Sequence, residues 1–283
     1  MGVEQNGKTI VLKLASGASA EIYLFGATVT SWIVDGKERM FLSSKSSLDS
    51  TKAIRGGIPI VFPIFGPPPS SPPEYAALKQ HGFVRTQDWT LDSIIMDRDE
   101  GVSVRLTSPP PPSEFNHKFT LSYVVTLTKH QLSTDVHINN TGNEDFIFQV
   151  LLHNYLAVPD VKKITITGLD KGIEFFDKAA GGKMGTWQGG ELKITQETDR
   201  VMWKVPSQEI KVDDGEGSGF LVKFRGFEDC TIWNPQEKSG KNMADMEENG
   251  WDRYICIEPG YVREFKSIKA GEEFLGQQVL TVL

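Results

Sequence analysis

The chain has 283 residues, 39% hydrophobic and 24% charged, and no stretch approaches the roughly 20 consecutive apolar residues of a membrane-spanning helix. Its formal charge of -7, without any run of Lys or Arg, excludes nucleic acid and anionic membranes as expected partners. We therefore expect a soluble protein, in which an anionic small molecule would need a local basic pocket.

The start of the chain and its cysteines indicate a cytoplasmic protein. Residues 1–14 carry an acidic residue early and have no apolar core of signal-peptide length, so we expect no secretion. Cys230 and Cys256, the two cysteines, lie far apart and form no CxxC or Cys/His metal spacing. We expect reduced thiols and no bound metal.

Period-two patterning dominates the chain, as in strands that are buried on one face. Along 119–128, apolar residues alternate mostly with Thr and Ser, and a turn at 129–131 leads to a second such run at 132–138. The Asn-rich segment 139–143 then leads to a third run from Phe146. Similar short runs occupy 9–14, 20–24, 28–33, 102–107, 163–167, 219–224, 231–233, 253–258 and 277–282.

These runs predict an all-β fold. Many short strands separated by turn residues are typical of a large antiparallel β-sandwich rather than of alternating β/α units. The proline-rich segments 67–73 and 109–112 are expected to be loops, because proline lacks an amide donor. We see no long amphipathic helix and no change of composition, so we expect a single domain over residues 1–283.

The first candidate for function is Arg55 in the segment RGGIPIVFP. Gly56 and Gly57 let the backbone bend tightly, while Pro59 and Pro63 stiffen the residues after the bend. This arrangement would fix Arg55 in place. An ordinary surface arginine before a Gly-Gly turn is the alternative.

The second candidate is the segment QHGFVR, which contains Gln80, His81 and Arg85. In an extended stretch His81 and Arg85 would project to the same side, so both could reach one pocket. The alternative is a solvated loop.

Three further candidates lie later in the chain. His153 lies within the predicted strand 146–156, on its mixed face, where a lone histidine is often structural. Asp199 lies in a polar stretch, where a solvated acid is the simple interpretation. Glu258 ends an apolar strand before Pro259-Gly260, and a carboxylate there is costly to desolvate unless it is exposed or has a task.

Taken together, these segments resemble the glucose-6-phosphate 1-epimerases, which are relatives of galactose mutarotase. The resemblance covers nearly the whole chain. It rests on Arg55-Gly-Gly-Ile-Pro, Gln80-His81-Gly with Arg85, Leu152-His153-Asn154-Tyr155, Gln196-Glu-Thr-Asp199, Trp233-Asn234-Pro235 and Cys256-Ile-Glu258-Pro-Gly260, in this order. Gln236, where some relatives carry an aromatic residue, is a departure at the rim of the pocket. The resemblance implies the galactose mutarotase-like supersandwich, a cofactor-free and metal-free interconversion of anomers, and a small-molecule substrate; we expect a monomer.

Carried over by position, the resemblance makes His153 the general acid on the ring oxygen and Glu258 the general base on the anomeric hydroxyl. Arg55, Gln80 and Arg85 resemble substrate and phosphate ligands, and Asp199 a ligand of sugar hydroxyls. His81 resembles a histidine near the anomeric end. The residue types suit the reaction, because an imidazole titrates near neutral pH and a carboxylate is normally ionised there.

Two other functions fit the same residues. A glycoside hydrolase or lyase needs two carboxylates about 5–10 Å apart, and Asp199 with Glu258 could supply them. A carbohydrate-binding protein without turnover could keep the pocket alone, although the presence of both His153 and Glu258 favours catalysis.

Overall fold

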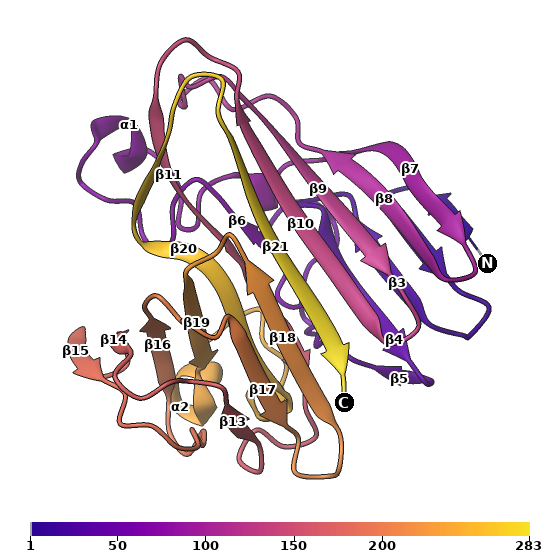
Figure 1. Ribbon diagram of the computed structural model, residues 1–283, viewed down its shortest axis with the longest axis vertical. Helices are drawn as coiled ribbons and strands as arrows, with labels where there is room; N and C mark the ends of the chain where they lie inside the picture. Colours follow the sequence, from indigo (N-terminus) through magenta and orange to yellow (C-terminus); the bar gives the residue numbers. More distant parts are fainter. Residues whose placement is uncertain (1) are drawn as a thin grey trace.

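The structure is a computed structural model that describes residues 2–283, and within that range the strands form three antiparallel sheets (Figure 1). The first sheet has the order β1 (Gly2–Asn6), β2 (Thr9–Lys13), β3 (Ser19–Tyr23), β4 (Thr28–Val34) and β5 (Lys37–Glu38). The second has the order β13 (Thr165–Thr167), β17 (Glu209–Asp213), β18 (Gly219–Arg225), β21 (Glu273–Val282), β10 (Gln131–Asn140), β9 (Phe119–Leu127), β8 (Gly101–Thr107) and β7 (Thr90–Arg98).

The third sheet has the order β15 (Lys183–Thr186), β14 (Glu174–Asp177), β16 (Thr198–Met202), β19 (Asp229–Asn234), β20 (Tyr254–Ile268), β11 (Phe146–Leu152) and β6 (Ile60–Val61), and β12 (Tyr155–Ala157) also pairs with β20. The helices are short: α1 (Pro73–Ala76), α2 (Gln236–Gly240) and the 3-10 turns η1 (Val84–Thr86) and η2 (Gly250–Arg253). The predicted all-β antiparallel architecture is confirmed. Within residues 2–283, no helix is long and apolar enough to cross a membrane.

The main hydrophobic core joins all three sheets. It takes Ile10 and Trp32 from the first sheet, Tyr123 and Val136 from the second, and Ile257 from the third, and all five are fully buried. This is the pattern expected of strands whose alternate residues face a common interior.

Strand β20 uses both of its faces. Ile255 and Ile257 enter the main core, whereas Tyr254 and Cys256 join a smaller cluster on the opposite face. Glu258 shares the second face by alternation. Figure 1 shows β20 curving between β19 and β11. Glu258 therefore lies on a central strand of the sheet and not on an edge strand.

The predicted end of this strand is wrong. The sequence predicts that the strand ends at Glu258 and that a stiff turn follows at Pro259-Gly260, whereas β20 continues to Ile268. Gly260 lies opposite Leu151, and a Cβ at this glycine would come within 2.8 Å of the carbonyl oxygen of Val150. The glycine thus allows close approach of a neighbouring strand rather than a turn.

Candidate active site

A cavity of about 390 Å³ opens on the face of the third sheet that carries Glu258. Its walls come from segments that lie far apart in the sequence. Six of the seven predicted site residues line it, namely Arg55, Gln80, His81, His153, Asp199 and Glu258.

His153 lies at a break between β11 and β12, where the sequence predicted one continuous strand. Its backbone N–H donates to the carbonyl of Pro59 at 3.0 Å, and the N–H of Tyr155 donates to the carbonyl of Gly57 at 2.9 Å. The imidazole stacks on the Tyr155 ring, with the centroids 4.8 Å apart and the planes at 10°, and meets Trp233 edge-on at 5.6 Å. The ring therefore has little freedom to turn.

The two glycines after Arg55 are required by close backbone approach. Gly57 has a φ of 65°, and a Cβ there would lie 2.0 Å from the carbonyl oxygen of Val29. No other residue type fits without moving the β4 strand. The segment consequently positions both Arg55 and, through the carbonyl of Pro59, the backbone of His153.

A buried amide pair ties the two predicted catalytic residues to the rest of the fold. The Asn154 side-chain amide donates to the carbonyl of Ile257 at 2.7 Å and to Oε1 of Gln278 at 2.8 Å. The Gln278 amide donates back to Oδ1 of Asn154 at 2.8 Å. Because Asn154 follows His153 and Ile257 precedes Glu258, these bonds fix the spacing of His153 and Glu258.

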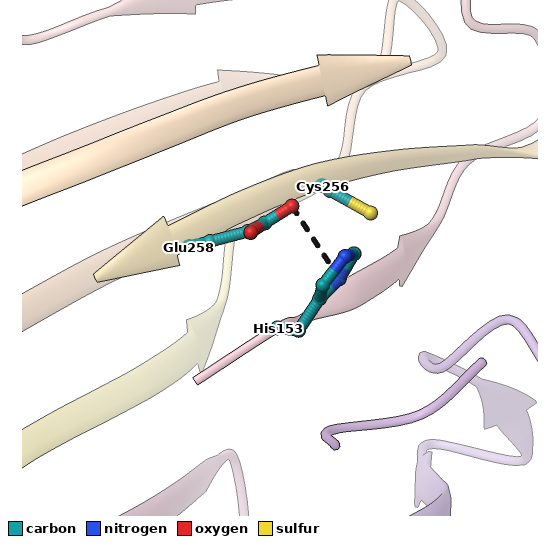
Figure 2. A group of neighbouring side chains, drawn as sticks. All are labelled: His153, Cys256 and Glu258. Carbon is teal, nitrogen blue, oxygen red and sulfur yellow. Dashed lines mark ion pairs between the residues drawn. The ribbon is translucent and has the colours of Figure 1, made fainter. Parts of the chain in front are cut away.

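His153 and Glu258 meet at the wall of the cavity (Figure 2). Nδ1 of His153 lies 3.4 Å from Oε1 of Glu258, and the two side chains are 11% and 1% exposed. In residues 2–283, neither Nδ1 nor either carboxylate oxygen has a hydrogen-bond partner. The pair is thus in contact, and these three buried atoms are left without a hydrogen-bond partner.

Burial shifts the pKa values of this pair in opposite directions. Desolvation raises the pKa of Glu258 well above its usual value, Asp199 raises it further and Lys178 lowers it. Desolvation lowers the pKa of His153, and the nearby His81 and Arg55 lower it further. These shifts favour a proton on Glu258 and a neutral His153. The pair gives a carboxylate base and an imidazolium acid once that proton moves from Glu258 to His153.

We predict a bell-shaped dependence of kcat/KM on pH. On the acid side, activity falls as the pair gains a second proton. This fall occurs at a pH below the ordinary histidine pKa, because the pKa of His153 is lowered. On the alkaline side, activity falls as the pair loses its last proton. This fall occurs at a pH above the ordinary carboxyl pKa, because the pKa of Glu258 is raised. Initial rates, corrected for buffer catalysis at each pH, measure this profile. A profile that falls on only one side of its maximum would contradict a pair that shares one proton.

Arg55 is held at two of its nitrogens. Nε donates to Oδ1 of Asp245 at 3.1 Å and Nη1 to the Tyr155 hydroxyl at 3.0 Å. Tyr155 thus contacts both the guanidinium of Arg55 and the imidazole of His153. A fixed guanidinium is well suited to charge-assisted hydrogen bonds with an anionic ligand.

The segment from Gln80 to Arg85 differs from its prediction. It is not extended: His81 has a φ of 64° and η1 follows, so the expected common side for His81 and Arg85 does not exist. His81 lines the cavity, and its Nδ1 accepts the N–H of Gly66 at 3.2 Å, which leaves the proton on Nε2. Arg85 is not among the lining residues, and its Nη2 donates to the carbonyl of Gln80 at 2.9 Å.

Asp199 lies on β16 and not in a solvated loop. Burial raises its pKa, and Lys178, whose Nζ is 3.8 Å from Oδ1, lowers it. The same Nζ lies 3.9 Å above the ring of Phe65. Asp199 and Lys178 thus form a half-buried ion pair inside the cavity.

Sequence reasoning missed several of the lining residues. Lys178 and Phe65 carry no local signal. Lys178 reaches Asp199 through the pairing of β14 with β16, and Phe65 comes from a distant segment that follows β6. Trp233 was noted only as part of a motif. Cys256, which lies beside His153 and Glu258, could have been found from its two-residue spacing to Glu258 on one strand.

Comparison with known proteins shows similarity over almost the whole chain. Residues 8–281 match the family model described as aldose 1-epimerase. A protein of Cenchrus ciliaris, provisionally named glucose-6-phosphate 1-epimerase, is 31% identical over 97% of this chain and 84% of its own. A protein of Escherichia coli K12 with the same provisional name is 29% identical over 88% of this chain and 82% of its own.

Solved structures agree on the fold. The crystal structure of a protein of Salmonella typhimurium, provisionally named a mutarotase, has a TM-score of 0.87 at 25% identity and covers 99% of this chain and 92% of its own. The galactose 1-epimerase of Lactobacillus acidophilus has a TM-score of 0.72 at 13% identity, covers 100% of this chain and 97% of its own, and shows the fold alone. The expected mutarotase-like fold is confirmed.

Proposed function

The chain belongs to the aldose 1-epimerase family, and from this premise we propose that it interconverts the α and β anomers of hexose 6-phosphates, chiefly glucose 6-phosphate. The observation that carries the proposal is the contact of His153 with Glu258 at the wall of a cavity that also holds fixed cationic side chains. The provisional names of the relatives support the phosphorylated substrate.

In the proposed mechanism, His153 is the general acid and Glu258 the general base. His153 gives a proton to the ring oxygen while Glu258 takes the proton of the anomeric hydroxyl, so the bond from the anomeric carbon to the ring oxygen breaks and an open-chain aldehyde forms. Rotation about the next carbon–carbon bond presents the other face of the carbonyl. Reversal of both proton transfers then closes the ring as the other anomer and restores the pair.

Positioning makes this pair effective. The stacked Tyr155 and the Asn154–Gln278 bonds hold His153, and the strand β20 holds Glu258, before any substrate arrives. Each positioned acid or base contributes typically about 10²–10⁴-fold, which suffices for a reaction that already proceeds in water.

The remaining predicted residues, which line the cavity or, like Arg85, contact a residue that lines it, suit a sugar phosphate. We propose that Arg55, Gln80 and Arg85 bind the phosphate end, and that Asp199 and His81 bind sugar hydroxyls. Lys178 adds a second cation to the cavity wall. In a protein of charge -7, these side chains supply the local positive field that an anionic substrate needs.

We further propose that residues 1–283 form one domain that works as a cytoplasmic monomer. The reaction class is tested by polarimetry on a pure anomer, with release of reducing ends from an oligosaccharide measured in parallel. We expect rapid loss of anomeric purity and no release of reducing ends. Release without anomerisation would indicate a hydrolase, and binding without either change would indicate a carbohydrate-binding protein.

A further inference from the structure

Cys256 is a buried nucleophile that the proposed reaction does not use. It is fully buried and lies two residues before Glu258 on one face of β20. Figure 2 shows both side chains directed toward His153. Donor atoms from these three residues, one from each, all lie within 4.8 Å of one another.

The oxygen and nitrogen donors of this group are unpartnered. Nδ1 of His153 and both carboxylate oxygens of Glu258 are buried without a hydrogen bond to any of residues 2–283. Counted over the whole residue, backbone included, His153 is 8% exposed and Glu258 is 1% exposed. Buried polar atoms without a partner call for an explanation, and a catalytic role and a bound ion are two of the recognised ones. Catalysis accounts for two of the three residues and leaves the thiol unexplained.

We propose that His153, Cys256 and Glu258 form a binding site for a thiophilic divalent cation, of which Zn²⁺ is the representative, and that the bound ion inhibits the enzyme. Three ligands from imidazole, thiolate and carboxylate, with a fourth position left open, are a donor set that zinc accepts. Magnesium and calcium prefer oxygen ligands throughout, so the thiol selects against them.

The distances suit such an ion after a small movement. Zinc bonds of about 2.0–2.2 Å to nitrogen and oxygen place two tetrahedral donors about 3.3–3.6 Å apart. Nδ1 of His153 and Oε1 of Glu258 are already 3.4 Å apart. Side-chain rotation that brings the more distant donors about 1 Å closer completes the site.

The charges also balance. The thiolate of Cys256 and the carboxylate of Glu258 together neutralise a divalent ion, so no net charge is left in the buried site. Two protons leave for solvent, one from the thiol and one shared until then by His153 and Glu258. The ion then coordinates His153 and Glu258, the two residues that transfer protons in the proposed reaction. This inhibitory consequence rests on the proposed function, whereas the binding itself does not.

The binding is tested with Co²⁺ as a spectroscopic probe on the full-length protein, prepared with a chelator and then dialysed. We expect a thiolate-to-cobalt charge-transfer band that saturates at a single ion for each chain and disappears when Zn²⁺ is added. Cys256→Ala should lose the band and bind Zn²⁺ at least about 100-fold more weakly, a larger loss than an outer-shell change causes. Cys256→Ser is the second variant in case the alanine form does not fold.

Cys230 provides a matched control, because it is equally buried on the neighbouring strand β19 but lies outside the three-residue group. Cys230→Ala should keep the band. In the activity arm, Zn²⁺ should inhibit the wild type and Cys230→Ala, a chelator should restore both, and Cys256→Ala should resist inhibition.

Three results would overturn the proposal: no band in the wild type, a band that survives both Cys256 substitutions, or loss of activity when metal is removed. If the protein showed the band but catalysed no anomerisation, the ion site would stand and the proposed function would be refuted.

Discussion

Replacing His153 with Ala, or Glu258 with Gln, should lower the enzymatic rate of anomerisation by at least about 100-fold in a protein that remains folded. Each change removes one of the two proton transfers and leaves the cavity in place. Glu258→Gln also keeps the volume of the side chain, so packing in the middle of the third sheet is retained. The effect is measured as the initial rate of anomerisation of a pure anomer. Thermal unfolding of each variant shows whether it remains folded.

A matched control lies on the second sheet. His137 and Glu273 form a similar contact, with Nδ1 and Oε1 3.0 Å apart, but on the exposed surface of β10 and β21. His137→Ala and Glu273→Gln should leave the rate within about twofold of the wild type, as surface substitutions usually do. Wild-type rates in a folded His153 or Glu258 variant would refute the roles that we assign.

The second large effect concerns the phosphate. Arg55→Ala and Arg85→Ala should each lower kcat/KM for glucose 6-phosphate by about 10- to 100-fold, since a hydrogen bond to a charged group contributes about 1.5–3 kcal/mol. The slower turnover of free glucose should hardly change, because free glucose has no phosphate. The measurement is the ratio of the two kcat/KM values in each variant.

Arg200 is the control for this test. Its Nε lies 2.8 Å from Asp177, an ion pair like that of Arg55 with Asp245. Arg200 does not line the cavity as Arg55 does, and its side chain does not donate to a lining residue as that of Arg85 does to Gln80. Arg200→Ala should leave the ratio unchanged. If Arg55→Ala and Arg85→Ala lowered kcat/KM for both substrates by the same factor, these arginines would shape the reacting end of the cavity instead. Arg55 could do so through its hydrogen bond to Tyr155.

Alternation made many strands predictable, although β17 was missed despite its clear alternation. Strands β9 and β10 alternate strongly because one face of each is buried in the main core. Strand β14 is short and partly exposed, so it carries little periodic signal. The passage of β20 through Pro259-Gly260 could not be predicted, because it depends on the close approach of β11.

The site was predictable where a motif combines chemistry with backbone constraint. The two glycines after Arg55 indicated a tight bend, and the structure gives its reason in the carbonyl of Val29. The turn at His81 was missed because its left-handed backbone is set by contacts with Gly66, a residue distant in the sequence. Lys178 was missed for the same reason, since only strand pairing brings it to Asp199.

The most direct test of the central claim is the anomerisation of α-glucose 6-phosphate and α-glucose, offered side by side at equal concentration. The quantity to measure is the rate in excess of the buffer-catalysed rate, for wild-type protein and for Glu258→Gln. We expect a large excess for the phosphorylated sugar, a smaller one for glucose, and almost none in the variant. The absence of any excess rate with either sugar would contradict the assignment of His153 and Glu258 as an acid–base pair for anomerisation.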